Sequence, residues 1–535
     1  MDIAFRAEDI KDKEVQKYYV ELPEDRKILE SLKSKYPVLL RGSRGVGKSL
    51  LLRIVEVELA EQYNKERILP VYMTLARAST IKVGNEGFMP WMISKISQAI
   101  KRSAEKNGIT LTKKSSVYNL TNQDQSEKEY IKSVEEVWEI RPKDLIPEGI
   151  PDVEDFKYNI EKFCEEYEIN RIVLLIDEAA HVFMPQQQRE FFTMMRDMRS
   201  AYISIKAAVY PGTTMYGSSF EPEHDAVMVN IDREIDQKNF TKLMYEIVEK
   251  QLNFSGSNNN LKNILDRKGD FNILAYASMG NPRILLKTCN SALEKGFKKS
   301  SIKNVFQEYY RSTVWSDYSN LAMRYPGHES LINWGRNFME DTVLPNLYSL
   351  NTKKISEGEK FEAISSIWVH KNSPRAVQEA LRLLSYSGLV SEGKSGIRGA
   401  DRQLGTRYLV NLGCAFSEDK EPLEYGQKIM DNFSTRRVAQ YGINHKAYGD
   451  LRDIPDELLE DENNIVLVNR LKDSYENLDL TNFQKKKLEE LNVSSIEDVL
   501  RKTEDDLKSL KQIGEVRARQ IMNAALTAVM EYVSG

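Results

Sequence analysis

The amino-acid sequence predicts a multidomain protein that begins with an α/β domain built on a parallel sheet. Three observations support this prediction. A glycine-rich turn at 42–49, Gly-Ser-Arg-Gly-Val-Gly-Lys-Ser, lies between two short apolar runs. A longer apolar run, 172–176, ends in Asp177 and Glu178, as a central strand does when its carboxyl end faces a ligand. Helical periodicity then dominates residues 236–310, which indicates a separate helical domain.

The turn at 42–49 has the G-x-x-x-x-G-K-S/T pattern of a P-loop, placed between a strand and the start of a helix. Glycines let consecutive backbone N–H groups curl around an anion, and the helix end adds its partial positive charge. Lys48 is expected to reach the β- and γ-phosphates of a nucleotide, and the Ser49 hydroxyl to bind Mg²⁺. The predicted nucleotide-binding residues of this turn are Gly42, Ser43, Arg44, Gly45, Val46, Gly47, Lys48, Ser49 and Leu50.

The acidic pair after the buried strand supplies the second half of such a site. Asp177 is expected to hold the Mg²⁺ through water, and Glu178 to orient and polarise the water that attacks the γ-phosphate. A buried strand that merely ends in a solvated acidic turn is the alternative, which the P-loop disfavours. A further strand at 202–209 leads to Thr213 and Thr214, and one of these two hydroxyls is expected to sense the γ-phosphate; the alternative is a simple Pro-Gly turn.

The helical domain carries Met-Gly-Asn-Pro-Arg-Ile-Leu at 279–285. Pro282 suits the first turn of a helix that Asn281 caps, and this places Arg283 in the same turn. An arginine there can contact the triphosphate from a separate domain and so convert nucleotide state into domain motion.

These motifs together resemble an AAA+ ATPase, and more narrowly the origin-recognition-type (ORC-like) initiator ATPases and the related STAND ATPases. Lys48 and Ser49 match the Walker A pair, Asp177 and Glu178 the Walker B pair, and Arg283 the second-sensor arginine. The resemblance covers roughly residues 1–310. It implies ATP and Mg²⁺ as cofactors, with Glu178, Lys48 and Arg283 as the catalytic residues and Ser49 and Asp177 at the metal.

One element of that family is missing from the sequence. Such ATPases often place an arginine finger in the helix after the first sensor, where it acts on the nucleotide of a neighbouring subunit. The stretch 215–229 contains no arginine, and Arg196, Arg199 and Arg233 lie outside the expected place. The sequence therefore favours slow turnover or an arginine from a partner, and it leaves open whether the chain forms an oligomer.

The C-terminal half predicts two modules of DNA-binding type, of which the first could instead dock a protein or act as an autoinhibitory module. Residues 373–412 have the order helix, strand, Gly/Arg-rich loop and strand, which resembles a winged helix. Residues 510–518 resemble a helix-hairpin-helix turn, in which Gly514 is kept and Gln512 replaces the other usual glycine. The basic residues expected to contact DNA phosphates from the first module are Arg375, Arg382, Lys394, Arg398, Arg402 and Arg407.

Composition limits the remaining possibilities. The chain has 535 residues, 41% hydrophobic and 29% charged, with a net charge of −4, which excludes a broad cationic coat for nucleic acid. It has no apolar run long enough to cross a membrane and no apolar signal-peptide core. Three distant cysteines predict no disulfide framework, so a reducing cytoplasm is expected. The predicted domains are 1–235 (ATPase, with an insertion at about 108–151), 236–325 (helical lid), 326–415 (winged helix), 416–475 (charged linker) and 476–535 (helix-hairpin-helix-like).

Two functions follow as hypotheses. The first is an ATP-controlled switch that binds and hydrolyses ATP and couples nucleotide state to DNA binding through residues 373–412 and 510–518. The second is a STAND-like regulatory ATPase that scaffolds a protein partner or effector, as in bacterial antiphage defence. The two modules of DNA-binding type favour the first hypothesis, and the acidic net charge and the missing hairpin glycine favour the second.

Overall fold

The structure is a computed structural model of the whole chain. It describes residues 10–75, 85–111, 150–179, 185–211, 214–254, 258–324, 328–358, 361–393, 396–399, 403–453, 471–491 and 493–534. The chain divides into two compact units. The first consists of Met1–Val314, Glu340–Lys371 and Arg382–Tyr441, and the second of Trp315–Met339, Asn372–Leu381 and Gly442–Gly535.

A five-stranded parallel sheet forms the centre of the first unit, and it confirms the predicted α/β domain. The strand order is β2-β3-β4-β1-β5. Strands β3 and β4 are buried along nearly their whole length, because both faces of the sheet are covered by helices. The strands are β1 (Val38–Arg41), β2 (Ile68–Thr74), β3 (Arg171–Asp177), β4 (Ile203–Val209) and β5 (Val227–Asn230).

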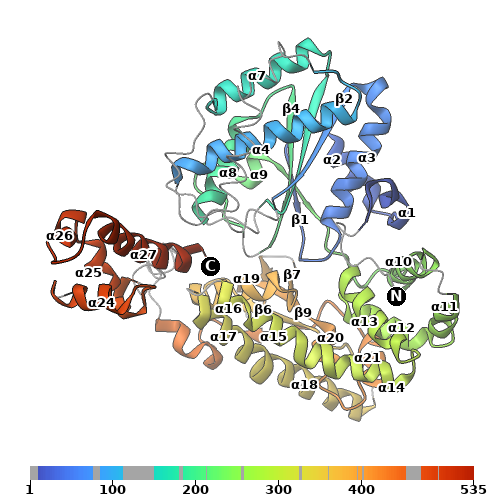
Figure 1. Cartoon of the computed structure of the whole chain (residues 1–535). Helices are drawn as coiled ribbons and strands as arrows, with labels where there is room; N and C mark the ends of the chain where they lie inside the picture. Colours follow the sequence, from blue (N-terminus) through green and yellow to red (C-terminus); the bar gives the residue numbers. More distant parts are fainter. Residues whose placement is uncertain are drawn as a thin grey trace. The chain divides into compact units, whose positions relative to one another are not determined.

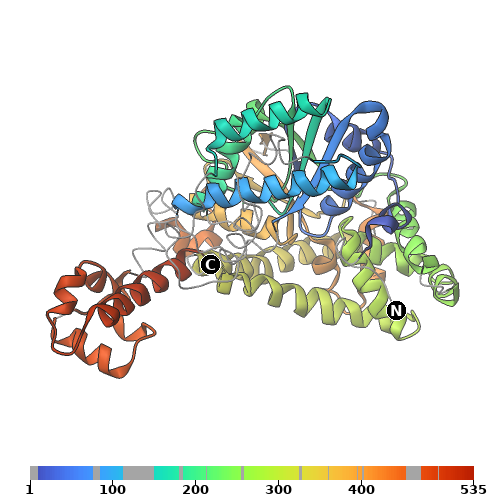
Figure 2. The same cartoon turned by 45° about the horizontal axis from the view of Figure 1, so that its top comes forward.

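Two hydrophobic layers flank this sheet. Alternate residues of β3 show the division, since Leu174 packs with one layer and Leu175 with the other. One face is covered by α4 (Asn85–Lys106), α7 (Val153–Glu166) and α8 (Pro185–Asp197), and the other by α1 (Val15–Tyr18), α2 (Asp25–Lys33) and α3 (Lys48–Glu66) (Figure 1). The long helix α4 lies across the first face (Figure 2). The short helix α9 (Pro222–Asp225) precedes β5.

The stretch predicted as a helical lid is helical in its described residues. Most of its helices are amphipathic and bury one apolar side, as α10 does with Phe240, Met244, Val248 and Leu252. The helices are α10 (Phe240–Phe254), α11 (Asn258–Leu265), α12 (Lys268–Ala277), α13 (Pro282–Glu294), α14 (Lys299–Val305), a π-helical stretch Phe306–Thr313, α15 (Val314–Ser319) and α16 (Leu321–Arg324).

A second, smaller sheet belongs to the C-terminal part of the first unit. Its order is β10-β6-β9-β7, and β8 also pairs with β9. The helix α19 (Arg375–Tyr386), β7 (Val390–Glu392), β8 (Ile397–Arg398) and β9 (Leu404–Val410) follow the predicted order of helix, strand, loop and strand. Strand β6 (Ser366–His370) was not predicted, and it pairs antiparallel with β9. A winged helix stays a prediction for this module.

The structure corrects the expectation of a solvated linker at 416–475. Helix α21 (Pro422–Asp431) buries Leu423, Tyr425 and Ile429, and strand β10 (Ala439–Tyr441) pairs in parallel with β6. The charged residues Glu424 and Lys428 lie on the exposed face of α21. The acidic run at 456–462, which suggested the linker, lies outside the described residues. Helix α20 (Leu412–Phe416) precedes α21, and α18 (Leu344–Glu357), which follows the π-helical stretch Phe338–Val343, precedes β6.

The second unit is helical over its described residues. Its first part includes α17 (Glu329–Asn337), where Trp334 stacks on Phe338 and donates its indole N–H to the Ala447 carbonyl at 3.1 Å. A 3₁₀ stretch, Lys446–Asp453, carries that carbonyl. The terminal block contains α24 (Asn482–Glu489), α25 (Ile496–Leu500), α26 (Glu504–Lys508) and α27 (Glu515–Ser534), which pack around a core of their own.

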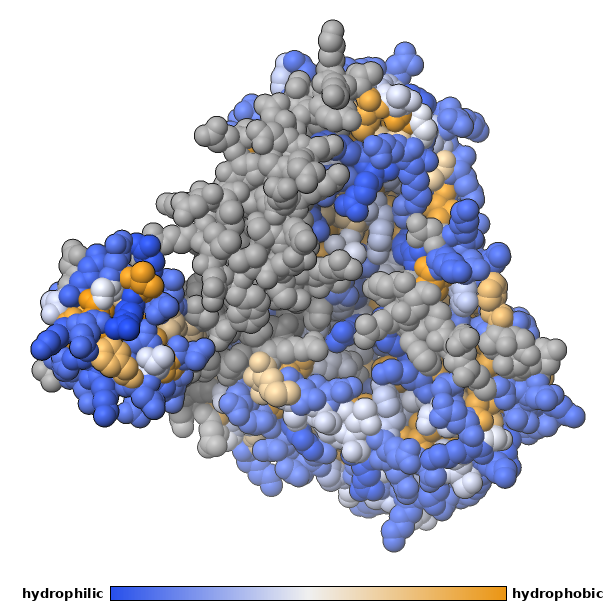
Figure 3. Space-filling view, in the orientation of Figure 1, coloured by the Kyte–Doolittle hydropathy of each residue, from blue (hydrophilic) through white to orange (hydrophobic). Residues whose placement is uncertain are grey.

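The described surface is mostly hydrophilic on the face shown in Figure 3, and its apolar residues form scattered spots. Among the described helices, none is both long and apolar enough to cross a membrane.

Candidate functional site

The carboxyl ends of three adjacent strands form the floor of the site. Because β4 lies between β3 and β1, the residue after β4 lies between the acidic pair and the P-loop. This is the edge where parallel sheets bind their ligands.

The P-loop connects β1 to α3, and two of its glycines have left-handed backbone angles that other residues rarely adopt. Gly45 has φ +92° and Gly47, the N-cap of α3, has φ +109°. The Lys48 ammonium lies inside this turn, where it donates to the Gly42 carbonyl at 2.5 Å and the Ser43 carbonyl at 3.0 Å. The lysine thus lies in the concave side of the loop, where a phosphate group would bind.

Lys48 is buried, and only 5% of its surface is exposed. Burial lowers the pKa of the Lys48 ammonium to about 7, although Asp177, Asp232 and Glu178 act in the opposite direction. The ammonium also lies 3.7 Å from the centre of the Tyr210 ring, a cation–π contact. This lysine can therefore gain a full positive charge when an anion arrives beside it.

Asp177 and Ser49 form the polar pair expected at a metal ion. Asp177 is buried, and this burial raises its pKa to about 6, while hydrogen bonds from Ser49 and Tyr72 act to lower it. The Tyr72 hydroxyl donates to Asp177 Oδ2 at 3.1 Å. A hydroxyl and a carboxylate side by side offer the hard oxygen ligands that Mg²⁺ prefers. The residues present therefore fit a magnesium ion.

Tyr210, which the sequence analysis did not single out, follows β4 directly and contacts both halves of the site. Its hydroxyl donates to Glu178 Oε1 at 3.0 Å, and its ring faces Lys48. Glu178 itself has the unusual φ of +60°. The order of the strands in the sheet was the signal that could have identified Tyr210. This residue follows β4, and β4 lies between β3, which ends in the acidic pair, and β1, which leads into the P-loop. A tyrosine after an apolar run otherwise resembles an ordinary core residue.

Thr214, one of the two residues predicted to sense the γ-phosphate, hydrogen-bonds within its own turn. The Thr214 hydroxyl accepts from the Tyr210 backbone N–H at 3.1 Å and donates to the Tyr210 carbonyl at 2.8 Å. It therefore closes the turn after β4 and fixes the backbone of Tyr210. Thr213 lies outside the described residues.

Helix α13 brings the predicted arginine to the P-loop. Asn281 caps the helix by accepting from the Ile284 N–H at 3.2 Å, and its amide donates to the Arg44 carbonyl at 2.7 Å. A Cβ atom on Gly45 would lie 2.8 Å from Asn281 Oδ1 and 3.0 Å from Arg283 Cβ. The absence of a side chain at Gly45 is therefore what lets the lid approach so closely.

Arg233 is a second residue that the sequence analysis did not place in the site. Its guanidinium donates to the Val46 carbonyl of the P-loop at 3.2 Å and to the Gly280 carbonyl of the lid at 2.8 Å. Its neighbour Asp232 accepts from the Ser43 backbone N–H at 3.1 Å. The segment after β5 thus joins the P-loop to the lid.

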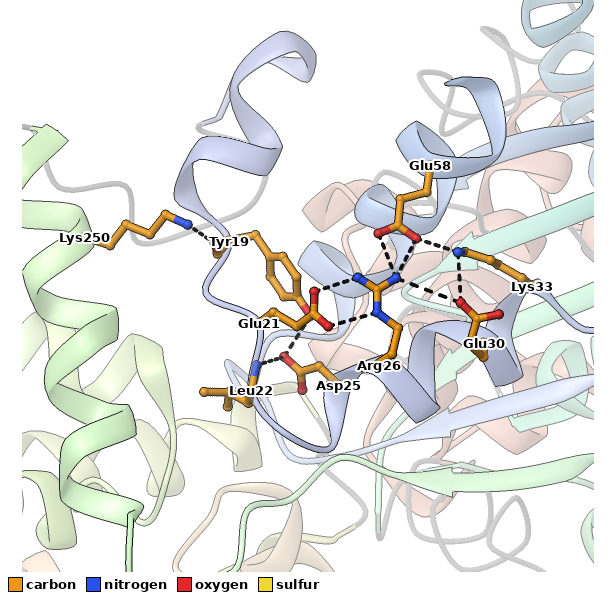
Figure 4. A network of polar contacts seen from close by, with 9 residues as sticks. All are labelled: Tyr19, Glu21, Leu22, Asp25, Arg26, Glu30, Lys33, Glu58 and Lys250. Carbon is orange, nitrogen blue, oxygen red and sulfur yellow. Dashed lines mark hydrogen bonds and ion pairs between the residues drawn. The ribbon is translucent and has the colours of Figure 1, made fainter. Parts of the chain in front are cut away.

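The lead-in segment before β1 lines the same cavity as the P-loop, and Figure 4 shows the polar contacts that hold this segment. Arg26 of α2 pairs with Glu21 at 2.6 Å and with Glu58 of α3 at 3.3 Å, which ties the segment to α3. Lys250 of α10 donates to the Tyr19 carbonyl, which ties it to the lid.

The Tyr19 hydroxyl donates to Asp25 at 3.0 Å, and the Leu22 backbone N–H donates to the same carboxylate oxygen at 3.1 Å (Figure 4). These bonds fix the backbone of the lead-in segment beside the cavity.

One cavity unites most of the predicted site residues. It is lined by the Gly45–Leu51 part of the P-loop and α3, by Glu178, by Arg283 and by Tyr210. Three further predicted residues contribute backbone: Gly42 and Ser43 accept from Lys48, and the Arg44 carbonyl accepts from Asn281.

The residues predicted to contact DNA are less uniform. Arg398 is exposed on the β8–β9 hairpin, whereas the Arg407 guanidinium donates to the Thr435 carbonyl. Arg375 and Arg382 are half-buried, and Lys394 and Arg402 lie outside the described residues.

A helix-hairpin-helix turn stays a prediction for the terminal block. Gln512 adopts φ +72°, the left-handed angle that a glycine at this place of a hairpin would take. Its carbonyl accepts from Arg517 at 2.7 Å.

Comparison with known proteins supports one family. The ORC-CDC6-like family model matches residues 4–80 and 150–311, which contain the P-loop, the acidic pair and the lid arginine. No curated protein matches the chain. Among solved structures, a Walker-type ATPase of Pyrococcus abyssi aligns with a TM-score of 0.41 at 14% identity, covering 80% of this chain and 99% of that one. The ORC2 protein of Aeropyrum pernix, in ADPNP and ADP complexes, aligns with a TM-score of 0.36 at 11% identity, covering 79% and 98%. Over residues 4–80 and 150–311, the chain is thus similar to the ORC-CDC6-like family.

Proposed function

We propose that this protein is an ATP-binding and ATP-hydrolysing molecular switch whose nucleotide state is transmitted to its C-terminal modules. The observation that supports it best is the convergence of side chains from distant parts of the sequence. Lys48, Ser49, Glu178 and Arg283 line one cavity, and Asp177 is hydrogen-bonded to Ser49. Phosphate binding, metal binding and water activation need these groups in one place.

Phosphate binding begins with the P-loop and Lys48. The Lys48 ammonium now bonds to two backbone carbonyls of the loop, and a triphosphate would offer it charged oxygens instead. Charge-assisted hydrogen bonds are stronger than those to neutral carbonyls, so the ammonium transfers to the β- and γ-phosphates. The N-terminus of α3 adds its partial positive charge at the same place.

Ser49 and Asp177 are the residues that would hold Mg²⁺. When bound, the ion supplies positive charge that neutralises the phosphate oxygens. Asp177 accepts bonds from Tyr72 and Ser49, which keep its carboxylate oriented toward the P-loop.

Hydrolysis is assigned to Glu178. Its carboxylate would orient a water molecule and accept a proton from it as the water attacks the γ-phosphate. One oxygen of this carboxylate is held by the Tyr210 hydroxyl. Tyr210 therefore restrains the residue that activates the water.

The switch itself lies in the contact between the P-loop and the lid. Asn281 and Arg233 both bridge these two parts through backbone carbonyls, and Arg283 is the lid cation beside the phosphates. ATP would draw Arg283 toward the γ-phosphate, and hydrolysis would release it. Differential contact with ATP and ADP is what moves such an equilibrium.

Two contacts can carry this change to the C-terminal part of the first unit. The Tyr210 ring meets the Tyr386 ring of α19 edge to face, with centroids 5.8 Å apart. Arg41, the last residue of β1, pairs with Glu392 of β7 at 3.0 Å. Both contacts begin at strand ends that border the nucleotide site.

Duplex DNA is the ligand that we propose for the C-terminal modules, with the exposed Arg398 as a phosphate contact. ATP turnover with and without duplex DNA, at two salt concentrations, tests this. DNA should stimulate turnover at low salt and lose its effect at high salt, because phosphate contacts release counterions. Arg398→Ala should weaken the stimulation, whereas the control Arg267→Ala, which removes a lid arginine that pairs with Asp270, should not. Turnover that ignores DNA at low salt would contradict the proposal.

A protein partner is the second candidate for the terminal block. Helix α27 begins with Glu515, whose carboxylate pairs with Arg519 at 3.1 Å. A carboxylate at a helix N-terminus repels a DNA phosphate from the place where a hairpin turn would bind it. If the terminal block binds DNA, Glu515→Gln should strengthen the affinity of the chain for DNA, because it removes this repulsion. An unchanged affinity for DNA would favour a protein partner for the block.

A further inference from the structure

The cavity that holds the P-loop also has an apolar part. Beyond the phosphate-binding residues it is lined by Ile10 and Val20 of the lead-in segment, Ile247 of α10 and Leu286 of α13. Aliphatic side chains of this kind pack against the flat faces of a nucleotide base.

Gln251 also lines this cavity, and it carries a buried polar atom that has no partner among the described residues. Gln251 of α10 has only 6% of its surface exposed, and its amide oxygen has no hydrogen-bond partner among the described residues. Gln251 lies on the buried face of α10, three residues after Val248 and one turn after Ile247. A buried acceptor left unpaired destabilises a protein, so a glutamine at such a position needs an explanation.

We propose that Gln251 recognises the adenine base by accepting a hydrogen bond from its 6-amino group. This inference rests on the proposed function, because the triphosphate must occupy the P-loop before the base can reach α10. A glutamine amide matches the edge of adenine, which carries an amino donor beside a ring-nitrogen acceptor. The site would therefore select adenine over bases with an oxygen at position 6.

The orientation of the Gln251 amide determines which base the cavity favours. The oxygen is the end of the Gln251 amide that lacks a partner among the described residues, so the cavity offers an acceptor. Hypoxanthine and guanine place a carbonyl oxygen at position 6, and two acceptors facing each other leave both unpaired. A site built around a buried polar group rejects a ligand that cannot pair with it.

The surroundings of Gln251 hold it in place. The preceding residue, Lys250, donates to the Tyr19 carbonyl, and the Tyr19 hydroxyl donates to Asp25 at 3.0 Å (Figure 4). These bonds join α10 to the lead-in segment on the other side of the cavity. The acceptor is therefore presented from a fixed backbone, which lowers the entropy cost of base binding.

Calorimetric titration of the full chain with ATP and with inosine triphosphate tests the proposal. The two nucleotides share ribose and phosphates, and they differ at position 6 and at the ring nitrogen beside it. The wild-type chain should bind ATP roughly 10- to 100-fold more tightly, the effect of one buried hydrogen bond. Gln251→Met, which keeps the volume and removes the acceptor, should abolish the preference mainly by weakening ATP. Gln251→Glu, which keeps an acceptor, should retain a preference for ATP.

Ile247→Val is the matched control, since it removes one methyl group from the same cavity wall and should weaken both nucleotides equally. Equal affinity of the wild-type chain for the two nucleotides would overturn the role of Gln251 and leave the P-loop proposal standing. A preference that survives in Gln251→Met would do the same. If neither ATP nor inosine triphosphate binds to the wild-type chain, the proposed function would be overturned as well.

Discussion

The Tyr210 hydroxyl donates a hydrogen bond to Glu178 Oε1 at 3.0 Å, and this bond joins the end of β4 to the residue assigned to water activation. The same ring lies over the Lys48 ammonium and against the Tyr386 ring. A single tyrosine thus contacts Lys48, Glu178 and helix α19. Its position makes it the residue through which α19 can influence hydrolysis.

Tyr210→Phe should raise the rate of ATP turnover. The change removes the hydroxyl that occupies one oxygen of Glu178, and it keeps the ring that faces Lys48. A hydrogen bond to a charged group is worth about 1.5–3 kcal/mol, so a gain of roughly 10- to 100-fold in kcat is expected if that bond must break before Glu178 acts. Steady-state kinetics measures this, with Tyr386→Phe as a control that keeps the ring contact. A lower kcat with unchanged ATP affinity would instead assign Tyr210 to productive positioning of Glu178.

Nucleotide binding should take up a proton above pH 7. Burial lowers the pKa of Lys48 to about 7 in the nucleotide-free chain, and the phosphates raise it again on binding. Above pH 7 the free chain therefore lacks a proton that the complex holds, and ATP affinity falls as the pH rises toward the pKa of the complex. Calorimetry at pH 8 in buffers of different ionisation enthalpy measures the uptake.

Lys48→Arg is the control for this measurement, because an arginine stays charged throughout this range. Its titration should show the protonation of the nucleotide alone. Equal proton uptake by the wild type and this variant would contradict the assignment of the shift to Lys48.

Arg233→Met should separate the lid from the P-loop. The guanidinium bonds to carbonyls on both parts, and methionine leaves these acceptors unpaired. We expect a lower melting temperature and roughly tenfold weaker ATP binding, consistent with one or two lost buried hydrogen bonds. Arg196→Met is the control, because Arg196 is exposed and bonds to Asp197 and the Ser219 carbonyl. Unchanged stability and affinity in Arg233→Met would show that this bridge contributes nothing to lid closure.

Acid should destabilise the terminal block through Asp498. This carboxylate accepts bonds from Ser494 and Ser495 and caps α25, and these bonds lower its pKa to about 2. A carboxylate whose pKa is lowered in the folded state stabilises the fold at any pH above the ordinary pKa of the carboxyl group, near 4. This contribution disappears as the pH falls toward 2. Asp498→Asn should therefore lower the melting temperature of the chain's terminal block at pH 7 and make no difference near pH 2. A stability difference that stays constant over this range would contradict the role of the charge.

The sequence predicted the parts of the fold that depend on local patterns. The central strands were predictable because β3 and β4 are continuous apolar runs, and α13 because Asn281 and Pro282 begin a helix in any context. Strand β6 was not predicted, since its five residues become buried only when the strand lies between β10 and β9 in the sheet. The same limit applies to the site. Lys48 belongs to a motif, whereas Tyr210 and Gln251 become meaningful only when β4 and α10 are placed beside the P-loop.

Single-turnover hydrolysis of ATP in the presence of Mg²⁺, by the wild-type chain and by Glu178→Gln, tests the central claim most directly. The wild type should convert bound ATP to ADP, slowly if no partner supplies an arginine. Glu178→Gln should bind ATP with similar affinity and retain it unhydrolysed, because the amide cannot accept a proton from water. Failure of the wild type to bind or convert ATP, or equal turnover by the variant, would contradict the assignment of this cavity as an ATPase site.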